Sequence, residues 1–129
     1  QKKGGIITHD DLKNYKAIWR EPLVFEYQDA KIITMGPPSS GGVALAQMLG
    51  MYSQIPKQKS VPNDAQYIQR LTEVMRRAYA DRNEYLGDPD FVKIPLRELT
   101  SEAYLRRRMH SYRPQTATKT SRITPGKIT

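Results

Sequence analysis

Two neighbouring serines are the first residues of this chain whose surroundings could support chemistry. Ser39 and Ser40 lie in the segment Pro-Pro-Ser-Ser-Gly-Gly at 37–42, between a predicted strand and a predicted helix. Backbone N–H groups and hydroxyls at the start of a helix can bind an anion or an oxyanion. The same residues suit a tight turn with a serine cap, and the segment is neither a P-loop nor a G-x-S-x-G elbow. We therefore favour the turn.

The two histidines do not supply an obvious base for these serines. His9 and His110 lie far apart in the sequence, and neither has a serine or a carboxylate at triad-like spacing. We expect His9 in the first turn of a short helix and His110 on a solvated helix face. A serine–histidine–aspartate site built from this chain alone is therefore disfavoured.

The carboxylates suggest ion pairs more than a cation site. Asp81 follows Arg77 by four residues, and Glu84 lies on the same predicted helix, so a solvated and ion-paired face is expected. Asp88 and Asp90 lie close together and could ligate a hard cation. Two carboxylates are too few to specify calcium, so we assign no metal site and no cofactor.

Composition narrows the class of protein. The chain has 129 residues, a net charge of +8 and no cysteine. The lack of cysteine excludes a disulfide scaffold, a cysteine-ligated metal and a cysteine nucleophile. No stretch approaches the roughly 18–20 apolar residues of a membrane helix, so we predict no membrane span. The first residues show no signal peptide, and we expect the chain to be a piece of a longer protein.

The positive charge is concentrated near the end of the chain. Residues 106–129 contain seven Lys or Arg and no Asp or Glu, so they account for seven of the eight net charges. Residues 113–129 are rich in Thr, Ser, Pro and Gly, a composition typical of a flexible, solvated segment. A nucleic-acid-binding arm is the alternative interpretation. It is disfavoured because no aromatic residue follows Tyr112 to stack on bases.

Hydrophobic spacing and turn residues predict a mixed α+β chain. Thr8 and Asp11 form a capping-box pattern at the first helix, and Trp19 is expected to pack against the seam that follows it. Asn63 and Gly87 are expected to begin and end the longest helix. The predicted elements are a helix at 9–15, strands at 22–27 and 31–35, helices at 43–54 and 65–86, turns at 88–92 and from Pro95, and a helix from Thr100 or Ser101 to about 112.

Two of these helices have apolar patterns that bear on how they pack. The 43–54 helix is apolar on almost every side, which is typical of a buried helix. The 65–86 helix has one apolar face that we expect to be buried; its members are Ile68, Leu71, Met75, Ala78, Tyr79 and Leu86. Two strands are too few for an independent sheet, and little in the chain can surround the 43–54 helix. We therefore expect other polypeptide to complete the core.

Three segments, in this order and spacing, resemble the gamma-glutamyltranspeptidase family. They are Gly-Gly-Ile-Ile-Thr-His-Asp-Asp-Leu-Lys-Asn-Tyr at 4–15, Gly-Pro-Pro-Ser-Ser-Gly-Gly at 36–42 and Ala-Tyr-Ala-Asp-Arg-Asn-Glu-Tyr-Leu-Gly-Asp-Pro-Asp-Phe-Val at 78–92. The resemblance covers roughly residues 4–112. Pro-Gly-Lys at 125–127 is also similar to the stretch before the processing site of that family.

The resemblance implies a segment of an N-terminal-nucleophile hydrolase αββα sandwich, mostly helical with a β-hairpin and incomplete on its own. Residues 1–112 would be the C-terminal portion of the large-subunit domain, and residues 113–129 a basic flexible tail leading toward the autocleavage site. The proenzyme would cleave itself into a large and a small subunit. It would then transfer the γ-glutamyl group of glutathione to water or to an amino acid or peptide acceptor. The threonine that begins the small subunit would be the nucleophile, with its own amino group as base.

The parts that the resemblance associates with catalysis do not occur in this chain. The Thr-Thr-His start of the small subunit is absent, and so is the earlier part of the large subunit with the arginine that holds the substrate carboxylate. Thr129 is not assigned as the nucleophile, and Ser39 and Ser40 do not correspond to the oxyanion-binding serines of the family. We assign no catalytic, cofactor-binding or metal-binding residue here and expect the chain alone to be inactive.

The expected partners are the rest of the large subunit, the small subunit and a γ-glutamyl substrate such as glutathione, with no nucleic acid. The resemblance implies a periplasmic or secreted protein. Two alternatives stay open. One is a relative acting on another amide, such as a cephalosporin side chain or poly-γ-glutamate. The other is the basic nucleic-acid-binding module considered above.

Overall fold

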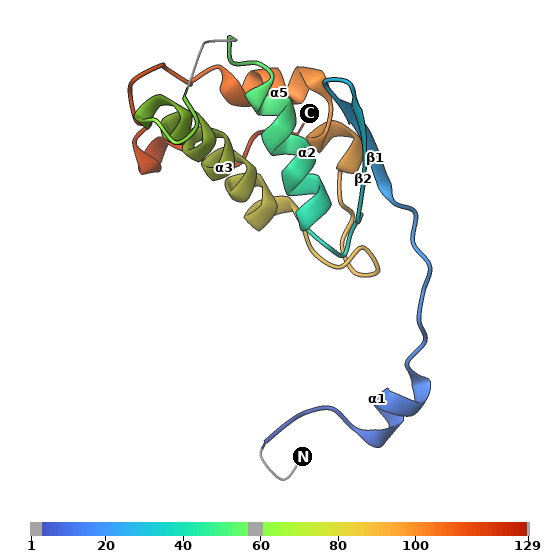
Figure 1. Cartoon of the computed structure of the whole chain (residues 1–129). Helices are drawn as coiled ribbons and strands as arrows, with labels where there is room; N and C mark the ends of the chain where they lie inside the picture. The colour runs from blue at the N-terminus through green and yellow to red at the C-terminus, as the bar shows by residue number, and fades with distance from the viewer. Residues whose placement is uncertain (1–3, 57–60, 129) are drawn as a thin grey trace.

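In the described part of the chain, a β-hairpin and four α-helices form the body, and an arm precedes them (Figure 1). The computed structural model describes residues 4–56 and 61–128. Thr129 and part of the predicted 55–62 loop therefore lie outside the described residues. Among the described residues, no helix combines the length and apolar character needed to cross a membrane.

The hairpin forms where the sequence predicts it. Strands β1 (Leu23–Tyr27) and β2 (Ala30–Thr34) are antiparallel, with Phe25 opposite Ile32. The two-residue turn lacks the favoured Asn-Gly or Asp-Gly pair, and Gln28 takes a φ of 53° to close it. Alternate residues of β1 face the helices and are half-buried, as expected for a strand with one covered face.

Helix α2 (Gly41–Tyr52) follows the hairpin directly and lies between it and the other helices. Its first turn packs so closely on the end of β2 that a Cβ on Gly42 would overlap the Met35 carbonyl. The predicted buried character of α2 is confirmed on most sides, although Leu45 remains 37% exposed. Ser40 occupies the N-cap position, but its side chain makes no capping hydrogen bond.

Helix α3 (Ala65–Tyr85) has nearly its predicted length, but its cap differs. The Asp64 carboxylate accepts a hydrogen bond from the Tyr67 backbone N–H at 2.6 Å, so Asp64 rather than Asn63 is the N-cap. Gly87 follows the last turn as expected, without the left-handed conformation that often ends a helix.

The remaining helices close the core from the other side. Helix α4 (Leu96–Leu99) begins after Pro95, and α5 (Glu102–Met109) begins at the N-cap Ser101 and ends three residues before its predicted end. Together with α2 and α3 they bury one apolar cluster. Its members are Met51, Ile55, Val74, Ala78, Leu99, Tyr104, Leu105 and Met109.

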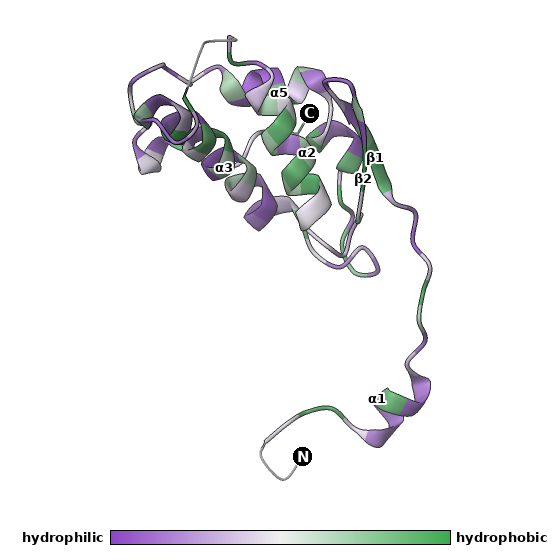
Figure 2. Ribbon diagram, viewed as in Figure 1, coloured by the Kyte–Doolittle hydropathy of each residue, from purple (hydrophilic) through white to green (hydrophobic). Residues whose placement is uncertain are grey.

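The face of α3 that was expected to be buried is mostly exposed, so that prediction is wrong for most of its residues. Only Ala78 is buried and Leu86 packs against the core. Four residues of this face form a line that we call the apolar stripe, and 37–53% of each side chain is exposed. They are Ile68, Leu71, Met75 and Tyr79. The body instead buries a largely charged face of the same helix. Figure 2 shows both characters on α3, in contrast to the more uniformly hydrophobic α2.

The N-terminal arm extends away from the body (Figure 1). It carries α1 (His9–Asn14), whose predicted capping box between Thr8 and Asp11 is confirmed. Its residues are exposed, and Trp19 is wholly so, which makes its expected packing wrong. The arm ends near Arg20, whose guanidinium pairs with Asp90 at 2.9 Å.

Candidate functional site

The serine pair forms a turn rather than a reactive centre. The Ser39 hydroxyl accepts a hydrogen bond from the Gly41 N–H at 3.3 Å, and the Ser39 N–H donates to the Gly36 carbonyl at 3.2 Å. The Ser40 hydroxyl accepts from Nε of Arg82 at 3.2 Å. The favoured interpretation as a strand-to-helix turn is therefore confirmed.

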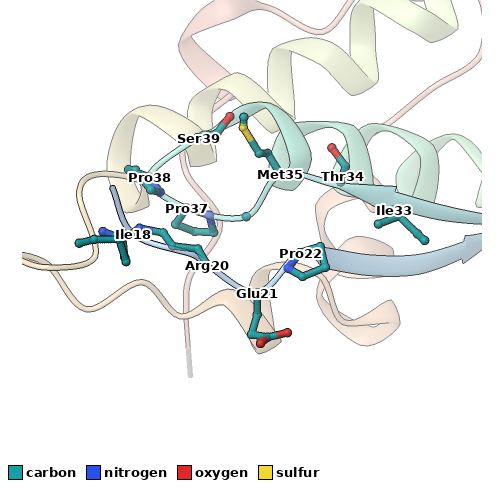
Figure 3. Close-up of a pocket in the computed structure, with 11 residues that line it drawn as sticks. Ile18, Arg20, Glu21, Pro22, Ile33, Thr34, Met35, Pro37, Pro38 and Ser39 are labelled. Atoms are coloured by element: carbon teal, nitrogen blue, oxygen red, sulfur yellow. The ribbon is translucent and has the colours of Figure 1, made fainter. Parts of the chain in front are cut away.

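An open pocket of about 690 Å³ lies beside this turn (Figure 3). It is lined by the end of β2, the turn itself and residues of the arm. Its two charged residues are Arg20, which is paired with Asp90, and Glu21. Figure 3 shows the Glu21 carboxylate and the Ser39 hydroxyl pointing away from one another. This lining holds no nucleophile with a base in reach.

The other candidate residues do not converge with the serines. His9 lies on α1 in the detached arm, and His110 is exposed at the end of α5. The Asp88 carboxylate accepts from the Asp90 N–H at 3.0 Å, while the Asp90 carboxylate pairs with the arm. In the described ranges, no group of three or more His, Cys, Asp or Glu side chains could hold a metal ion.

The structure brings polar side chains together on the buried face of α3. Five residues at four-residue intervals lie along this face, and we call them the polar ladder. They are Gln69, Glu73, Arg77, Asp81 and Tyr85. Glu73, Arg77 and Asp81 are each only 1% exposed. Burial of unpaired charges is very costly, so these groups must find partners, and many of the partners lie in the C-terminal tail at 113–128.

Glu73 holds the tail at Thr118. Its Oε1 accepts from the Thr118 N–H at 2.9 Å, and its Oε2 accepts from the Thr118 hydroxyl at 2.5 Å. Arg76 donates to the Thr118 carbonyl at 2.8 Å, and Arg77 donates to the Thr118 hydroxyl at 3.3 Å. Every polar group of this one tail residue is therefore bonded to α3.

Arg77 links the ladder to the end of α5. Its guanidinium donates to Glu73 Oε2 at 2.6 Å, to the Arg108 carbonyl at 3.0 Å and to the Ser111 hydroxyl at 2.9 Å. The predicted pair between Arg77 and Asp81 is therefore wrong. The planar, always charged guanidinium suits this role, since it donates in several fixed directions at once.

Asp81 is the second buried carboxylate and holds the tail at Gly126. Arg108 donates to it from Nε at 3.0 Å and also pairs with its other oxygen at 3.0 Å. Gln47 donates to it at 3.1 Å, and the Gly126 N–H donates to it at 2.8 Å. The Tyr85 hydroxyl donates to the Gly126 carbonyl. The expected solvated face around Asp81 is thus buried and fully bonded.

Two groups in this cluster have displaced pKa values. Burial raises the pKa of Glu73, but hydrogen bonds from Thr118 and Arg77 outweigh burial and leave that pKa below its usual value. Burial is also the main reason that the pKa of the Tyr104 hydroxyl is raised, and the nearby Asp81 carboxylate adds to the effect. At neutral pH Glu73 is therefore charged and Tyr104 is neutral.

Three arginines just before the tail form ion pairs with carboxylates of this chain. Arg106 pairs with Glu102, Arg107 with Glu98 and Arg108 with Asp81. Residues 113–128, which the sequence predicts to be a flexible tail, follow α3 through the bonds described above and include one short 3-10 turn at Thr120–Arg122. Mobility of this tail stays a prediction.

Sequence reasoning did not find the polar ladder. The available signal was the four-residue spacing of Glu73, Arg77 and Asp81, which places three charges on one face of a helix. That spacing is also common on solvated helices. The partners Gln47 and Arg108 come from distant segments, so no local pattern could identify them.

Comparison with known proteins finds relatives of a single family along almost the whole chain. A family model described as Gamma-glutamyltranspeptidase matches residues 1–128. A glutathione hydrolase proenzyme of Pseudomonas aeruginosa is 44% identical, with the match covering 98% of this chain and 23% of that protein. One of Escherichia coli with the same description is 41% identical, covering 99% of this chain and 22% of that protein.

Solved structures agree with this match. The gamma-glutamyltranspeptidase of Helicobacter pylori superposes with a TM-score of 0.87 at 42% identity, covering 96% of this chain and 36% of that one. The enzyme of Pseudomonas nitroreducens, complexed with L-DON, gives a TM-score of 0.90 at 40% identity, covering 97% and 38%. The chain spans less than a quarter of the length of the two glutathione hydrolase proenzymes described above.

Proposed function

The chain belongs to the gamma-glutamyltranspeptidase family, and on that premise we propose that it is a structural part of a γ-glutamyltransferase or glutathione hydrolase proenzyme. The observation that carries the proposal is the match to a glutathione hydrolase proenzyme over 98% of the chain but only 23% of that relative. We propose that residues 1–112 belong to the C-terminal portion of a large subunit and that residues 113–129 lead toward its cleavage site.

The exposed surfaces support an incomplete body. The arm, with Trp19 wholly exposed, and the apolar stripe on α3 leave large hydrophobic groups in water. Exposed apolar surface of this extent marks sites where other polypeptide packs. We propose that the rest of the large subunit and the small subunit cover these surfaces, and that the hairpin joins a larger sheet in an αββα sandwich.

The proposed reaction places the chemistry outside this chain. The complete protein would transfer the γ-glutamyl group of glutathione to water or to an amino acid or peptide, with the threonine at the start of the small subunit as nucleophile. We propose that no catalytic residue lies in residues 1–129 and that no cofactor or metal is needed. The serines support this assignment, because the Ser39 hydroxyl is bonded within the turn and the Ser40 hydroxyl is bonded to Arg82 of α3. We also propose, from the family resemblance, a periplasmic or secreted location.

Expression of the complete precursor tests the proposal. We expect it to convert into two subunits and to transfer the γ-glutamyl group of glutathione to a dipeptide acceptor. The 129-residue chain alone should show no turnover. A precursor in which alanine replaces the threonine that starts the small subunit is the matched control and should stay uncut. Turnover by the 129-residue chain, or a precursor without γ-glutamyl transfer, would contradict the assignment.

A second candidate function is action on a different amide. An acylase ACY 1 proenzyme of Pseudomonas is 38% identical over 78% of this chain, and a capsule biosynthesis protein CapD proenzyme of Bacillus anthracis is 35% identical over 80%. A cephalosporin acylase from Bacillus halodurans shares the fold with a TM-score of 0.74 at 22% identity. Comparing kcat/KM of the processed enzyme for glutathione, a cephalosporin side-chain amide and poly-γ-glutamate separates these candidates. A clear preference for either of the last two would replace glutathione as the donor.

A further inference from the structure

Two buried carboxylates of α3 receive backbone N–H groups from the tail in matching order. Glu73 binds the N–H of Thr118, and Asp81 binds the N–H of Gly126. Glu73 and Asp81 are eight residues apart, and so are Thr118 and Gly126. Because the earlier carboxylate binds the earlier tail residue, tail and helix run in the same direction. Eight residues of α-helix rise about 12 Å, whereas eight extended residues can span roughly 28 Å. The intervening tail therefore has slack, and its position along α3 is set by the hydrogen bonds that it makes. The two docking points hold residues 118 and 126, while Gln69 donates to the carbonyls of Arg113 and Thr116 and Arg76 donates to the Thr120 hydroxyl.

Each docking point accepts few residue types. At residue 118 the hydroxyl donates to Glu73 and accepts from Arg77, so the position requires Thr or Ser. At residue 126 any side chain would overlap Tyr104 and Arg108, so the position requires Gly. Since both requirements must be met eight residues apart, the tail can dock in only one register.

Release of the tail would break hydrogen bonds to charged groups that the docked tail covers. Glu73 would lose two of its hydrogen-bond donors and Asp81 would lose one. Hydrogen bonds to a charged acceptor are stronger than neutral ones and make a net contribution to stability even against competition from water. The docked tail is therefore the favoured state of the chain, even though the composition of residues 113–129 is typical of a disordered segment.

We propose that the polar ladder of α3 is a docking site for the tail, and that it positions the polypeptide that follows residue 128. This inference rests on the proposed function, in which that polypeptide contains the self-cleavage site. Glu73 and Asp81 are then positioning residues, and they act on cleavage only through the tail. By holding Thr118 and Gly126, they fix the point at which the chain leaves the body.

Variants of the tail test the proposal without changing α3. Thr118→Val keeps the shape of the side chain and removes the hydroxyl, whereas Thr118→Ser keeps the hydroxyl. Thr124→Val is the matched control, because Thr124 is exposed. Each variant is made in the complete precursor. Hydrogen exchange of residues 116–128 is measured in a cleavage-blocked form, and conversion into subunits is followed over time in the unblocked form.

We expect the tail amides of Thr118→Val to exchange at least about tenfold faster, because the variant loses both charge-assisted hydrogen bonds of the hydroxyl, to Glu73 and from Arg77. Conversion should slow by up to the same factor, while exchange of α2 amides stays at the wild-type rate. Thr118→Ser and Thr124→Val should behave as wild type in both measurements, which a general loss of structure could not reproduce.

Three results would overturn the proposal in different ways. Unchanged tail exchange in Thr118→Val would show that the ladder is not the docking site. Faster exchange with wild-type conversion would show that docking does not position the cleavage site. If the wild-type precursor does not convert at all, the proposed function and the positioning role both fail, while the exchange data still decide whether the ladder docks the tail.

Discussion

The two long faces of α3 contrast in a way that reverses the usual expectation for an amphipathic helix. The apolar stripe, from Ile68 to Tyr79, is about half exposed, whereas Glu73, Arg77 and Asp81 are almost completely buried. An isolated small domain would place these faces the other way round. The contrast teaches that burial within this chain follows the partners available for each side chain rather than hydrophobicity alone.

Each face has a partner of matching chemistry in this interpretation. The polar ladder is covered by a tail that presents backbone N–H groups and hydroxyls. The apolar stripe has no apolar cover of comparable extent in the described part of the chain. The remaining three quarters of a precursor, by the lengths of the curated relatives, would supply that cover. Variants on each face can break or sharpen this comparison.

The largest effect is expected at Asp81. Asp81→Ala removes the common acceptor of Arg108, Gln47 and the Gly126 N–H, and it leaves a buried guanidinium without its carboxylate. Breaking a buried pair from one side costs about 3–5 kcal/mol. We expect a large drop in the yield of folded precursor and in its Tm, measured by calorimetry. The exposed Glu84→Ala is the control on the same helix. A wild-type Tm for Asp81→Ala would contradict the importance of the polar face.

The next effect tests the tail side of the same face. Gly126→Ala introduces a Cβ that overlaps the Tyr104 hydroxyl and the Arg108 side chain. Overpacking of a close contact costs about 1–3 kcal/mol. We expect protease cleavage within residues 113–128 to become faster in the complete precursor, while cleavage elsewhere is unchanged. Gly5→Ala, where a Cβ meets nothing within 4 Å, is the control. Equal cleavage rates in both variants would argue against a docked tail.

A smaller and context-dependent effect is expected on the apolar stripe. Met75→Ser changes a residue that is 39% exposed here. In the 129-residue chain it should alter stability by no more than about 0.5 kcal/mol, as for other surface substitutions. In the complete precursor it should lower the Tm clearly, because the stripe would be covered there. The same shift in both proteins would show that nothing packs on the stripe.

The smallest effect is expected from lowering the pH, which should speed hydrogen exchange of the tail. The pKa of Glu73 is held below its usual value of 4.5 by Thr118 and Arg77, with Arg76 also facing the carboxylate. A group with a depressed pKa stabilises the folded state above its unfolded pKa and loses that contribution as pH falls through its folded pKa. Tail exchange, corrected for intrinsic rates, should therefore be constant near neutral pH and accelerate below pH 4.5. A Glu73→Gln precursor should lack this acid step, and retention of the step would assign it to another group.

Local elements of the fold could be predicted from the sequence. The hairpin, the capping box at Thr8 and the N-cap at Ser101 depend on short-range chemistry that a few neighbouring residues determine. The helix at 65–85 was equally clear from its periodicity. The family resemblance found at three segments was confirmed by the match over residues 1–128.

The orientation of those elements could not be predicted in the same way. The apolar period of α3 correctly indicated a helix, but it could not say whether the covering surface lies inside this chain. The prediction that Trp19 packs within the chain was wrong for the same reason, because the sequence does not show which surface covers a residue. Trp19 is wholly exposed in the arm. The docking of the tail depends on Thr118 and Gly126 meeting residues some 45 positions away. Such contacts follow from tertiary structure and leave no periodic signal.

The hairpin has a consequence for handling this chain by itself. A sheet of only β1 and β2 has two outer edges, and the described residues provide no third strand for either. Open strand edges pair readily with other molecules, and Val24 and Ile33 leave apolar side chains exposed beside these edges. In the complete precursor, neighbouring strands would occupy the same edges as part of normal folding. The 129-residue chain made alone should instead self-associate, in proportion to its concentration, through the very backbone groups that would join it to the rest of its fold.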